Sequence, residues 1–583
     1  MVGRPVQALL MTGQPCGGVT AYRLLRGTTV VSQGTAGEQR PISGNSGYRH
    51  ACVIDLGRGL PAGRYQLQAA GATAALRVGS AHDVFRPLLA HAVRFYQAQR
   101  DGAHVISSVL RRRPSHLNDR HAGVYAPPAY RNDVLSAPLR RVGGPVDVSG
   151  GWFDAGDFVK FSGTTAFTVG LLETALRDDP TAFASSTRHA LAQEVRFGLA
   201  WLRKMDDQRH HVVYYQVGIG SGNATTLGDH DLWRLPQRDD AMRGHARRYL
   251  SHRPVFRAAA PGRPIAPSLA GRMSAAFALC AQLWPRTALG RTCWHRATSV
   301  LALARTRHVR AQVTASPRDY YPEDEWRDDL EWANTEVARA ATVVPGASAH
   351  RRPYARAAAR WAAAYRDHGA DGGDTFTLYD GSALAHADLA ALVPQGGGPG
   401  WALGRRGVLT DLRAQLVAAA RRAAADPFAF GGYRWDPTPH ALGLVVSALR
   451  YDALTRSQRF ASLARSQLAW VLGRNAWGSS FVIGAGQTFP HCPQHVVANL
   501  VGSTDGTPPL LLGGTVDGPS TYIPGPGFFG NAVACPASGG NPFRAFDLGK
   551  WRYVDRVSSW ATVEPALDYT ALSLLAFADA AAG

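Results

Sequence analysis

The sequence predicts a mainly α-helical protein in which paired helices close into a barrel behind a small β-sandwich. Short apolar runs alternate with turn signals over residues 6–80, helical periodicity begins at Asp83, and about a dozen helical stretches follow. The 583 residues leave room for one large domain and one small domain. We therefore expect a sandwich over residues 1–82 and a helical domain over residues 83–583.

The N-terminal segment is typical of a sandwich of immunoglobulin type. A turn over residues 60–63 leads into an alternating run, and the set is one or two strands short at its N-terminal end, which fits a missing start. The predicted strands cover 19–25, 28–31, 51–56, 63–68 and 73–78.

Apolar residues at helical spacing predict the second domain. Leu191, Val195, Leu199 and Leu202 share one face, and Gly473 marks the C-terminal end of another helix. Long loops at 101–160, 207–265 and 474–565 hold most of the Trp, Tyr, His and Gly, so we expect the functional site there. The predicted helices begin near 83 and then cover 163–177, 185–206, 266–285, 290–306, 324–342, 348–367, 378–392, 407–425, 438–453, 456–473 and 566–582.

The net charge of +20 does not identify a partner. Only three of the 63 basic residues are lysine, and arginine is scattered through alanine-rich helices, which indicates a GC-rich genome rather than a nucleic-acid surface. No run of 18 or more apolar residues predicts a membrane span. We expect a monomer without nucleic-acid or membrane partners.

Compartment and cysteine state stay open at the sequence level. The start at Met1 lacks the segments of a secretory signal, so the protein is either cytoplasmic or missing residues. The six cysteines contain no C-x-x-C pair, which argues against a zinc ribbon. They form three disulfides, for example Cys16 with Cys52, or remain six buried thiols.

The densest chemical segment covers residues 146–161. Gly150 and Gly151 allow unusual backbone angles, and Asp154 and Asp157 follow three residues apart across Ala-Gly. Both carboxylates can therefore turn toward one cavity. A bare D-x-x-D is more often a turn with a helix-capping Asp, but the whole run, VDVSGGWFDAGDFVKF, is far more specific.

The whole run resembles the double-Asp signature of glycoside hydrolase family 9, the cellulase family. Further resemblances follow in the family's order, at 53–67, 85–100, 214–233, 328–333, 467–486 and 558–569. The resemblance implies an (α/α)6-barrel catalytic domain behind an immunoglobulin-like module, secretion, and hydrolysis of β-1,4-bonds in cellulose or a related β-glucan without a required cofactor.

The resemblance also assigns the catalytic groups. Glu564 falls on the acid, Asp157 on the base, and Asp154 on the carboxylate that helps to hold the water. The family inverts the anomeric centre, which needs about 6.5–9.5 Å between acid and base. Apolar neighbours such as Trp560 and Tyr569 could raise the pKa of Glu564.

Substrate contacts are expected from aromatic faces and polar side chains. Any of these candidates could equally belong to the core, although Tyr215, His230 and Trp233 sit where the family's cleft residues sit. The expected substrate-binding residues are Trp152, Tyr215, His230, Trp233, Gln494, His495 and, with weaker support beside Asp119, His116; Trp326 and Tyr553 are further candidates.

Several positions depart from the family pattern. The family's Pro-His-His-Arg is here Pro493 to Val496, so that Gln494 replaces a His and Val496 an Arg. The Asn before the acid is Val563, the Asp after Gln-Val-Gly is Ile219, and aromatic-Gly-Ser-Asn is 435–438, Trp-Asp-Pro-Thr. These changes predict an altered sugar preference or reduced activity. The alternatives are a hydrolase of another β-linked sugar, such as a glucosamine polymer, an exo-acting enzyme, or a non-catalytic sugar-binding relative.

The resemblance also allows a structural calcium ion. Asp229, Asp231, Asp239 and Asp240 lie in one loop where oxygen ligands could gather. No loop matches a calcium-binding motif, so the sequence assigns no metal ligands.

Overall fold

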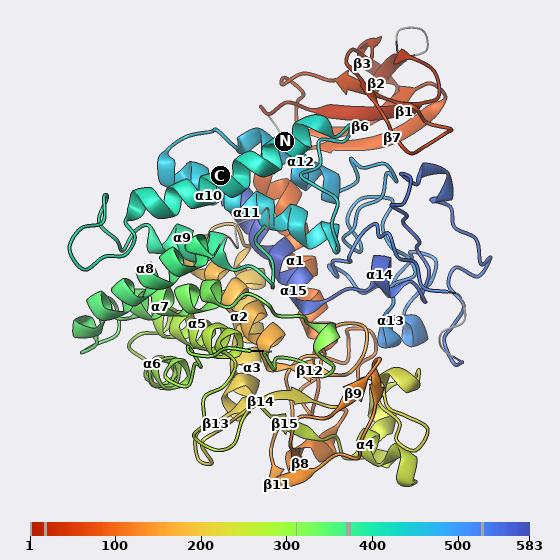
Figure 1. Cartoon of the computed structure of the whole chain (residues 1–583). Helices are drawn as coiled ribbons and strands as arrows, with labels where there is room; N and C mark the ends of the chain where they lie inside the picture. The colour runs from red at the N-terminus through yellow and green to blue at the C-terminus, as the bar shows by residue number, and fades with distance from the viewer. Residues whose placement is uncertain (1–2, 17–19, 311, 369–374, 526–529, 583) are drawn as a thin grey trace.

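The computed structural model describes residues 3–16, 20–310, 312–368, 375–525 and 530–582. It shows a β-sheet domain followed by a helical domain (Figure 1). The predicted fold class is confirmed. Val19, the start of one predicted strand, lies outside the described residues.

The N-terminal domain is a sandwich of two antiparallel sheets. The first has the strand order β1-β5-β4 and the second β3-β2-β6-β7. Tyr22 and Leu24 point inward from β2 while Arg23 points outward, as the alternation predicts. The strands are β1 Gln7–Thr12, β2 Ala21–Arg26, β3 Thr29–Thr35, β4 Gln39–Pro41, β5 His50–Asp55, β6 Gly63–Ala69 and β7 Ala72–Val78. The sequence missed β1 and β4.

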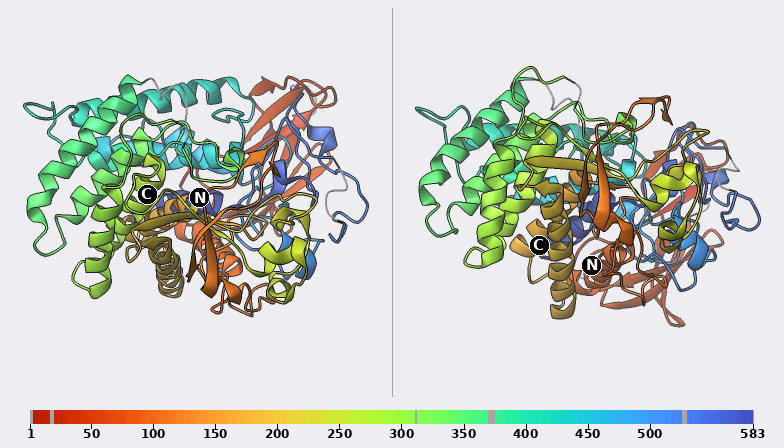
Figure 2. Two further views of the ribbon diagram at one scale, coloured as in Figure 1. Left: turned by 60° about the horizontal axis from the view of Figure 1, so that its bottom comes forward. Right: turned by 90° about the horizontal axis from the view of Figure 1, so that it is seen from below.

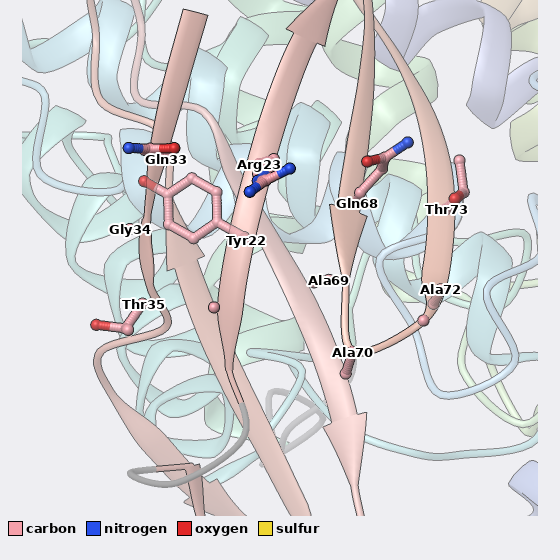
Figure 3. A pocket seen from close by; sticks show the side chains of 12 residues that line it. Tyr22, Arg23, Gln33, Gly34, Thr35, Gln68, Ala69, Ala70, Ala72 and Thr73 are labelled. Atoms are coloured by element: carbon pink, nitrogen blue, oxygen red, sulfur yellow. The ribbon is translucent and has the colours of Figure 1, made fainter. Parts of the chain in front are cut away.

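The outer face of the four-stranded sheet carries a shallow open groove of about 730 Å³ (Figure 3). Gln33, Arg23, Gln68 and Thr73 form one row across its strands, because the register pairs each with the next. The groove belongs to the sandwich and contains none of the carboxylates predicted to be catalytic.

All six cysteines are paired. The disulfides join Cys16 to Cys52, Cys280 to Cys293, and Cys492 to Cys535. The alternative of six buried thiols is therefore wrong. The first bridge crosses the sandwich core, and the third holds the long loop after residue 474.

Twelve helices of the described residues build the second domain, and they confirm the predicted stretches. Helices with one buried face alternate along the chain with helices buried on almost every side. They are α1 Ala81–Gln99, α2 Ser162–Asp178, α3 Ser185–Met205, α5 Pro267–Leu283, α6 Ala288–Leu301, α7 Arg327–Ala340, α8 Arg351–Asp367, α9 Ser382–Leu389, α10 Arg405–Ala425, α11 Pro437–Thr455, α12 Ala461–Val471 and α15 Leu567–Ala582.

The helices form two concentric rings. The inner helices pack in the closed order α2-α5-α7-α9-α11-α15-α2, and α3, α6, α8, α10, α12 and α1 each cover one of them (Figures 1 and 2). Because each outer helix carries the chain back, all six inner helices run in the same direction. The segments that precede them therefore meet at one end of the ring, and these segments contain Asp154, Asp157 and Glu564.

The loops also contain a sheet that the sequence did not predict. Its order is β11-β8-β15-β14-β12, and β13 Asp206–Asp207 pairs with β14. The strand β12 Lys160–Phe161 pairs with β14 Val212–Val217 immediately before α2 begins, so the sheet fixes the end of the double-Asp segment. The other strands are β8 Ala122–Tyr125, β11 Arg141–Val146 and β15 Val255–Arg257.

The sandwich is joined to the helical domain by direct contacts. The amide of Asn45 donates to the carbonyls of Ala545 and Asp547 at 2.9 and 3.0 Å. The rings of Tyr48 and Phe546 stack with centroids 5.2 Å apart. The sandwich therefore braces the loop that leads toward Glu564. None of the helices in the described ranges has the length and hydropathy needed to cross a bilayer.

Replacing both Cys16 and Cys52 by Ala should destabilise the sandwich. The bridge closes a separation of 36 residues, for which chain entropy predicts a loss of about 4 kcal/mol. The matched removal of Cys280 and Cys293, separated by 13 residues, should cost about 3 kcal/mol. Denaturant unfolding of both variants checks the order, and a larger loss from the shorter loop would contradict it.

Candidate active site

The double-Asp loop passes between α1 and the last inner helix. Phe153 donates its N–H to the carbonyl of Gln99 at 2.9 Å, and Asp154 accepts from the N–H of Leu567 at 3.0 Å. Gly151 has a φ of +78°, and a side chain there would collide with Trp201, since a Cβ would lie 2.6 Å from its ring. The loop therefore needs glycine at this close approach.

Asp154 is buried and held by two hydroxyl groups. Thr164 donates to its Oδ1 and Tyr321 to its Oδ2. Burial raises the pKa of Asp154 to about 7, although both hydroxyl groups favour the charged form. Asp154 is thus fixed in one orientation beside the more exposed Asp157.

Asp157 forms an ion pair with His230. The His230 Nε2 lies 2.5 Å from Oδ2 of Asp157, whose side chain keeps 17% of its surface exposed. Burial lowers the pKa of His230, but the hydrogen bond and charge of Asp157 outweigh it and raise the pKa to about 9. His230 is therefore a cation at neutral pH, and its Nδ1 lies 3.1 Å from the hydroxyl of Tyr320.

Glu564 lies against the same loop. Its Oε1 accepts the N–H of Gly156 at 3.1 Å, so the side chain contacts the residue directly before Asp157. Burial, and then the charge of Asp157, raise the pKa of Glu564 to about 8. A carboxyl group with a raised pKa thus lies against the same loop as Asp157, which is paired with His230.

Gly156 connects three distant segments. Besides donating to Glu564, it accepts the N–H of Val496 at 2.8 Å. A Cβ at Gly156 would lie 2.1 Å from the backbone oxygen of Gln494, whose own N–H donates to Val563 at 3.0 Å. Gly156 therefore joins the double-Asp loop to the 494–496 segment and to Glu564 by hydrogen bonds.

Three predicted sugar-binding aromatic residues lie in the interior. Trp152 and Tyr215 have no exposed surface and Trp233 has 4%. The hydroxyl of Tyr215 lies 2.6 Å from that of Ser316, and the indole of Trp233 donates to Asn499 at 2.8 Å. These positions indicate support of the loops rather than contact with a sugar. Trp326 and Tyr553 are also buried.

Two predicted histidines are likewise enclosed. His116 binds Asp101 and Asp239 with its two ring nitrogens, at 2.9 and 3.1 Å. His495 bonds to Gln99 through Nε2 at 2.7 Å, and its Nδ1 accepts the N–H of Ala498. Burial lowers the pKa of His495 to about 3, so it is neutral. Both rings are occupied within the protein and position other groups.

The other predicted binding residues are better placed. His230 keeps 29% of its side chain exposed beside Asp157. Gln494 is 8% exposed, and its side-chain oxygen has no hydrogen-bond partner within the described residues. The sequence thus brings Asp154, Asp157, Glu564, His230 and Gln494 together at one place.

A buried ionic network fixes the far end of the loop. Arg253 donates to the carbonyl of Phe158 at 2.6 Å and pairs with Asp119 at 2.6 Å. Lys160 pairs with Asp101 at 2.8 Å and with Asp119 at 3.1 Å. Because each buried charge has a partner, the network holds residues 158–160 without leaving a charge unpaired.

The acidic residues considered for calcium do not form a calcium site. Arg234 pairs with Asp229 at 2.6 Å and with Asp239 at 2.5 Å. Asp231 accepts backbone N–H groups of residues 222 and 228, and Asp240 those of residues 117 and 118. A calcium ion would have to displace Arg234 and these amide donors from the four carboxylates. Within the described ranges, no group of three or more His, Cys, Asp or Glu is placed to bind a metal.

The sequence missed several residues of this centre. Tyr320 and Tyr321 precede α7, and Asp436 precedes α11. They therefore lie at the same end of the helix ring as the double-Asp loop, which precedes α2. Asp517 accepts the N–H of Glu564 at 3.2 Å. Their position in the sequence could have identified them, because polar residues directly before an inner helix lie at this end of the ring.

Two exposed aromatic rings contact Trp560, in the short helix that precedes Glu564. The rings of Trp435 and Tyr522 lie 5.9 and 5.6 Å from that of Trp560, and their side chains are about half exposed, at 51% and 52%. Trp560 is the first residue of α14 Trp560–Val563, and Glu564 caps the C-terminal end of this helix. We call Trp435, Tyr522 and Trp560 the aromatic patch.

The chain is similar to known proteins over most of its length. Residues 85–577 match the model of glycosyl hydrolase family 9. Endoglucanase C of Cellulomonas fimi is 26% identical over 459 residues, which cover 74% of this chain and 37% of that protein. Endoglucanase 14 of Oryza sativa subsp. japonica is 28% identical over 216 residues, covering 34% of this chain and 38% of the other. The chain spans about a third of the length of the curated relatives it matches.

Solved structures show the same fold. A metagenome-derived family 9 endoglucanase has a TM-score of 0.73 at 22% identity, covering 100% of this chain and 97% of the other. AaCel9A in complex with cellobiose-like isofagomine has a TM-score of 0.68 at 19% identity, with coverage of 99% and 97%. The likeness includes the N-terminal sandwich.

Replacing Gly156 by Ala should destabilise the protein by about 1–3 kcal/mol, because the new Cβ would overlap the backbone of Gln494. The matched change Gly163→Ala, in α2 with nothing within 4 Å of the new Cβ, should be neutral or stabilising. Thermal unfolding compares the two. Equal stability of both variants would show that the loop is not locked at Gly156.

Proposed function

We propose, from the premise that this chain belongs to glycosyl hydrolase family 9, that it hydrolyses β-1,4-glycosidic bonds in cellulose or a related β-glucan. The observation that carries the proposal is that Gly156 holds the carboxyl of Glu564 directly beside Asp157, which is paired with His230. The endoglucanase names of several relatives support the substrate class.

Glu564 is the acid in this proposal. Cleavage of a glycosidic bond needs a proton on the leaving oxygen. Its raised pKa keeps that proton at neutral pH, and the Gly156 N–H orients the carboxyl. No cofactor takes part in this step.

Asp157 is the base. It takes a proton from the water that attacks the anomeric carbon on the face opposite the leaving group. The His230 ring binds one oxygen of Asp157 and fixes its orientation, while Asp154 supplies a second oriented carboxyl for the water. Attack from the opposite face inverts the anomeric centre.

The aromatic patch supplies a surface for sugar rings. Aromatic side chains pack against the apolar faces of sugars and leave the hydroxyl groups to polar neighbours. Trp435 and Tyr522 are half exposed, and their rings contact Trp560, in the short helix that Glu564 caps. A glucan chain bound there would continue toward the acid.

The 494–496 segment favours an altered sugar preference. Val496 offers no side-chain donor, and Gln494 presents a buried oxygen without a partner among the described residues. Because both positions depart from the family pattern described above, a β-1,4-glucosamine oligosaccharide is the second candidate substrate. Product analysis on cello-oligosaccharides and β-1,4-glucosamine oligosaccharides distinguishes the two sugars, and the product lengths separate endo from exo cleavage.

The disulfides support secretion. Three paired bridges are typical of proteins that fold in an oxidising compartment. We therefore propose an extracellular monomer that meets its polysaccharide outside the cell.

Glu564→Gln and Asp157→Asn should each lower kcat on a β-1,4-glucan by about 100- to 10,000-fold, because each removes one proton transfer. The control Glu38→Gln, in an exposed ion pair of the sandwich, should leave kcat unchanged. Reducing-sugar release measures all four proteins. Equal rates in wild type and both site variants would reject the assignment, and tight oligosaccharide binding without any turnover would favour a non-catalytic relative.

The activity should fall as the pH rises through about 8. Glu564 must be protonated to act, and burial raises its pKa to about 8, so kcat/KM loses the acid form above that value. The pH profile of kcat/KM measures this limb. A limb near the ordinary value of 4.5 would contradict the role of burial at Glu564.

A further inference from the structure

We infer that Asp436 and Asp517 form a carboxyl pair that shares one proton and positions Glu564 as the acid. The inference rests on the proposed function for the role of Glu564. It concerns two residues to which the resemblance to the family assigned no role.

The hydrogen bonds around Asp517 lead directly to the acid. Its Oδ2 accepts the backbone N–H of Glu564 at 3.2 Å, and its Oδ1 accepts the hydroxyl of Tyr569 at 3.3 Å. The carboxyl of Asp436 lies within hydrogen-bonding reach of the side chains of Asp517 and Tyr569. Two carboxyl groups can share a hydrogen bond only when one of them carries a proton.

The backbone of Asp436 indicates that this contact has a role. Asp436 has φ and ψ of +50° and +60°, a left-handed conformation that costs a non-glycine residue free energy. It stands at the N-cap of α11, where Asp commonly caps the helix, yet its side chain makes no capping bond. With 92% of its surface buried, it is directed to Asp517 instead.

Further contacts transmit this arrangement to Glu564. Thr438 of α11 donates its N–H to the carbonyl of Asp517 at 3.1 Å, and Gly518 donates to Thr562 at 3.2 Å. Val516 pairs with Pro565 in an antiparallel bridge. Residues 516–518 thus lie between the start of α11 and the segment that carries the acid.

The surroundings favour one shared proton. Burial raises the pKa of Asp436 to about 7, and burial and Asp436 hold the pKa of Asp517 well above its usual range. A doubly ionised pair would place two like charges beside Glu564. Five titratable groups face the pair, and each either affects the pKa of a pair member or has its own pKa affected by one. They are Glu564, Asp568, Tyr379, Tyr553 and Tyr569.

The test compares Asp436→Gly with Asp436→Asn on two β-glucosides, one with a poor leaving group and one with an activated aryl leaving group. Glycine suits the left-handed backbone but removes the carboxyl, whereas Asn keeps the shape and a donor. On the poor leaving group, Asp436→Gly should lower kcat by about tenfold or more with KM unchanged. On the activated substrate, which needs little help from an acid, its kcat should match that of wild type.

Asp436→Asn should restore most of the lost rate. The control Arg456→Gly changes the other end of α11 at a residue of the same conformation, with φ of +52°, and should not alter kcat. Equal loss by Asp436→Gly on both substrates, or no loss on the poor one, would overturn the inference.

A second measurement needs no substrate. A buried carboxyl with a raised pKa keeps a proton that the unfolded chain has released, so stability falls as the pH rises from about 4 to about 7. Asp436→Asn removes one such group, and its Tm should fall less than that of wild type over this range. Equal falls would show that the pair holds no proton. A wild type that cleaves no glycoside would reject the proposed function and leave this result standing.

Discussion

The closed ring of six parallel inner helices is the constraint on which the rest of the molecule depends. Each inner helix is buried on nearly every side, so it can be held only by two inner neighbours and an outer partner. Closure brings six helix N-termini to one end, where unpaired N–H groups and helix dipoles favour negative charge. The carboxyls of the site come from the segments before α2, α11 and α15. Closure of the ring therefore accounts both for the fold and for the gathering of carboxyl groups at one end of it.

Two opposing effects set the state of those carboxyls. Burial disfavours the charged form and dominates at Glu564, Asp154 and Asp436, whose pKa values are all raised. Asp157 has other neighbours, because it pairs with His230 and keeps some exposed surface. Two aspartates of one short loop thus have different surroundings, and Gly156 links this loop to Glu564.

The sequence was sufficient for the helices because apolar spacing reports which face is buried. The resemblance to a family motif pointed to Asp154, Asp157 and Glu564, which the fold brings to one end of the ring, and their catalytic roles stay a proposal. It was insufficient where the outcome depends on tertiary contacts. His230 and His495 have the same side chain, but only the fold shows that one faces Asp157 and the other bonds to Gln99. The strands around β14 escaped prediction because their partners lie far apart along the chain. Domain boundaries at residue 82 stay a prediction.

The hydrogen bond between Gly156 and Glu564 spans 408 positions of the chain, and this separation matters during synthesis. At roughly 5–20 residues per second, the ribosome makes Glu564 about 20–80 seconds after Gly156. The inner ring cannot close until α15 has emerged, so the half-made chain carries the double-Asp loop without Glu564. The carboxyl cluster is therefore completed late in translation, when the first inner helix meets the last.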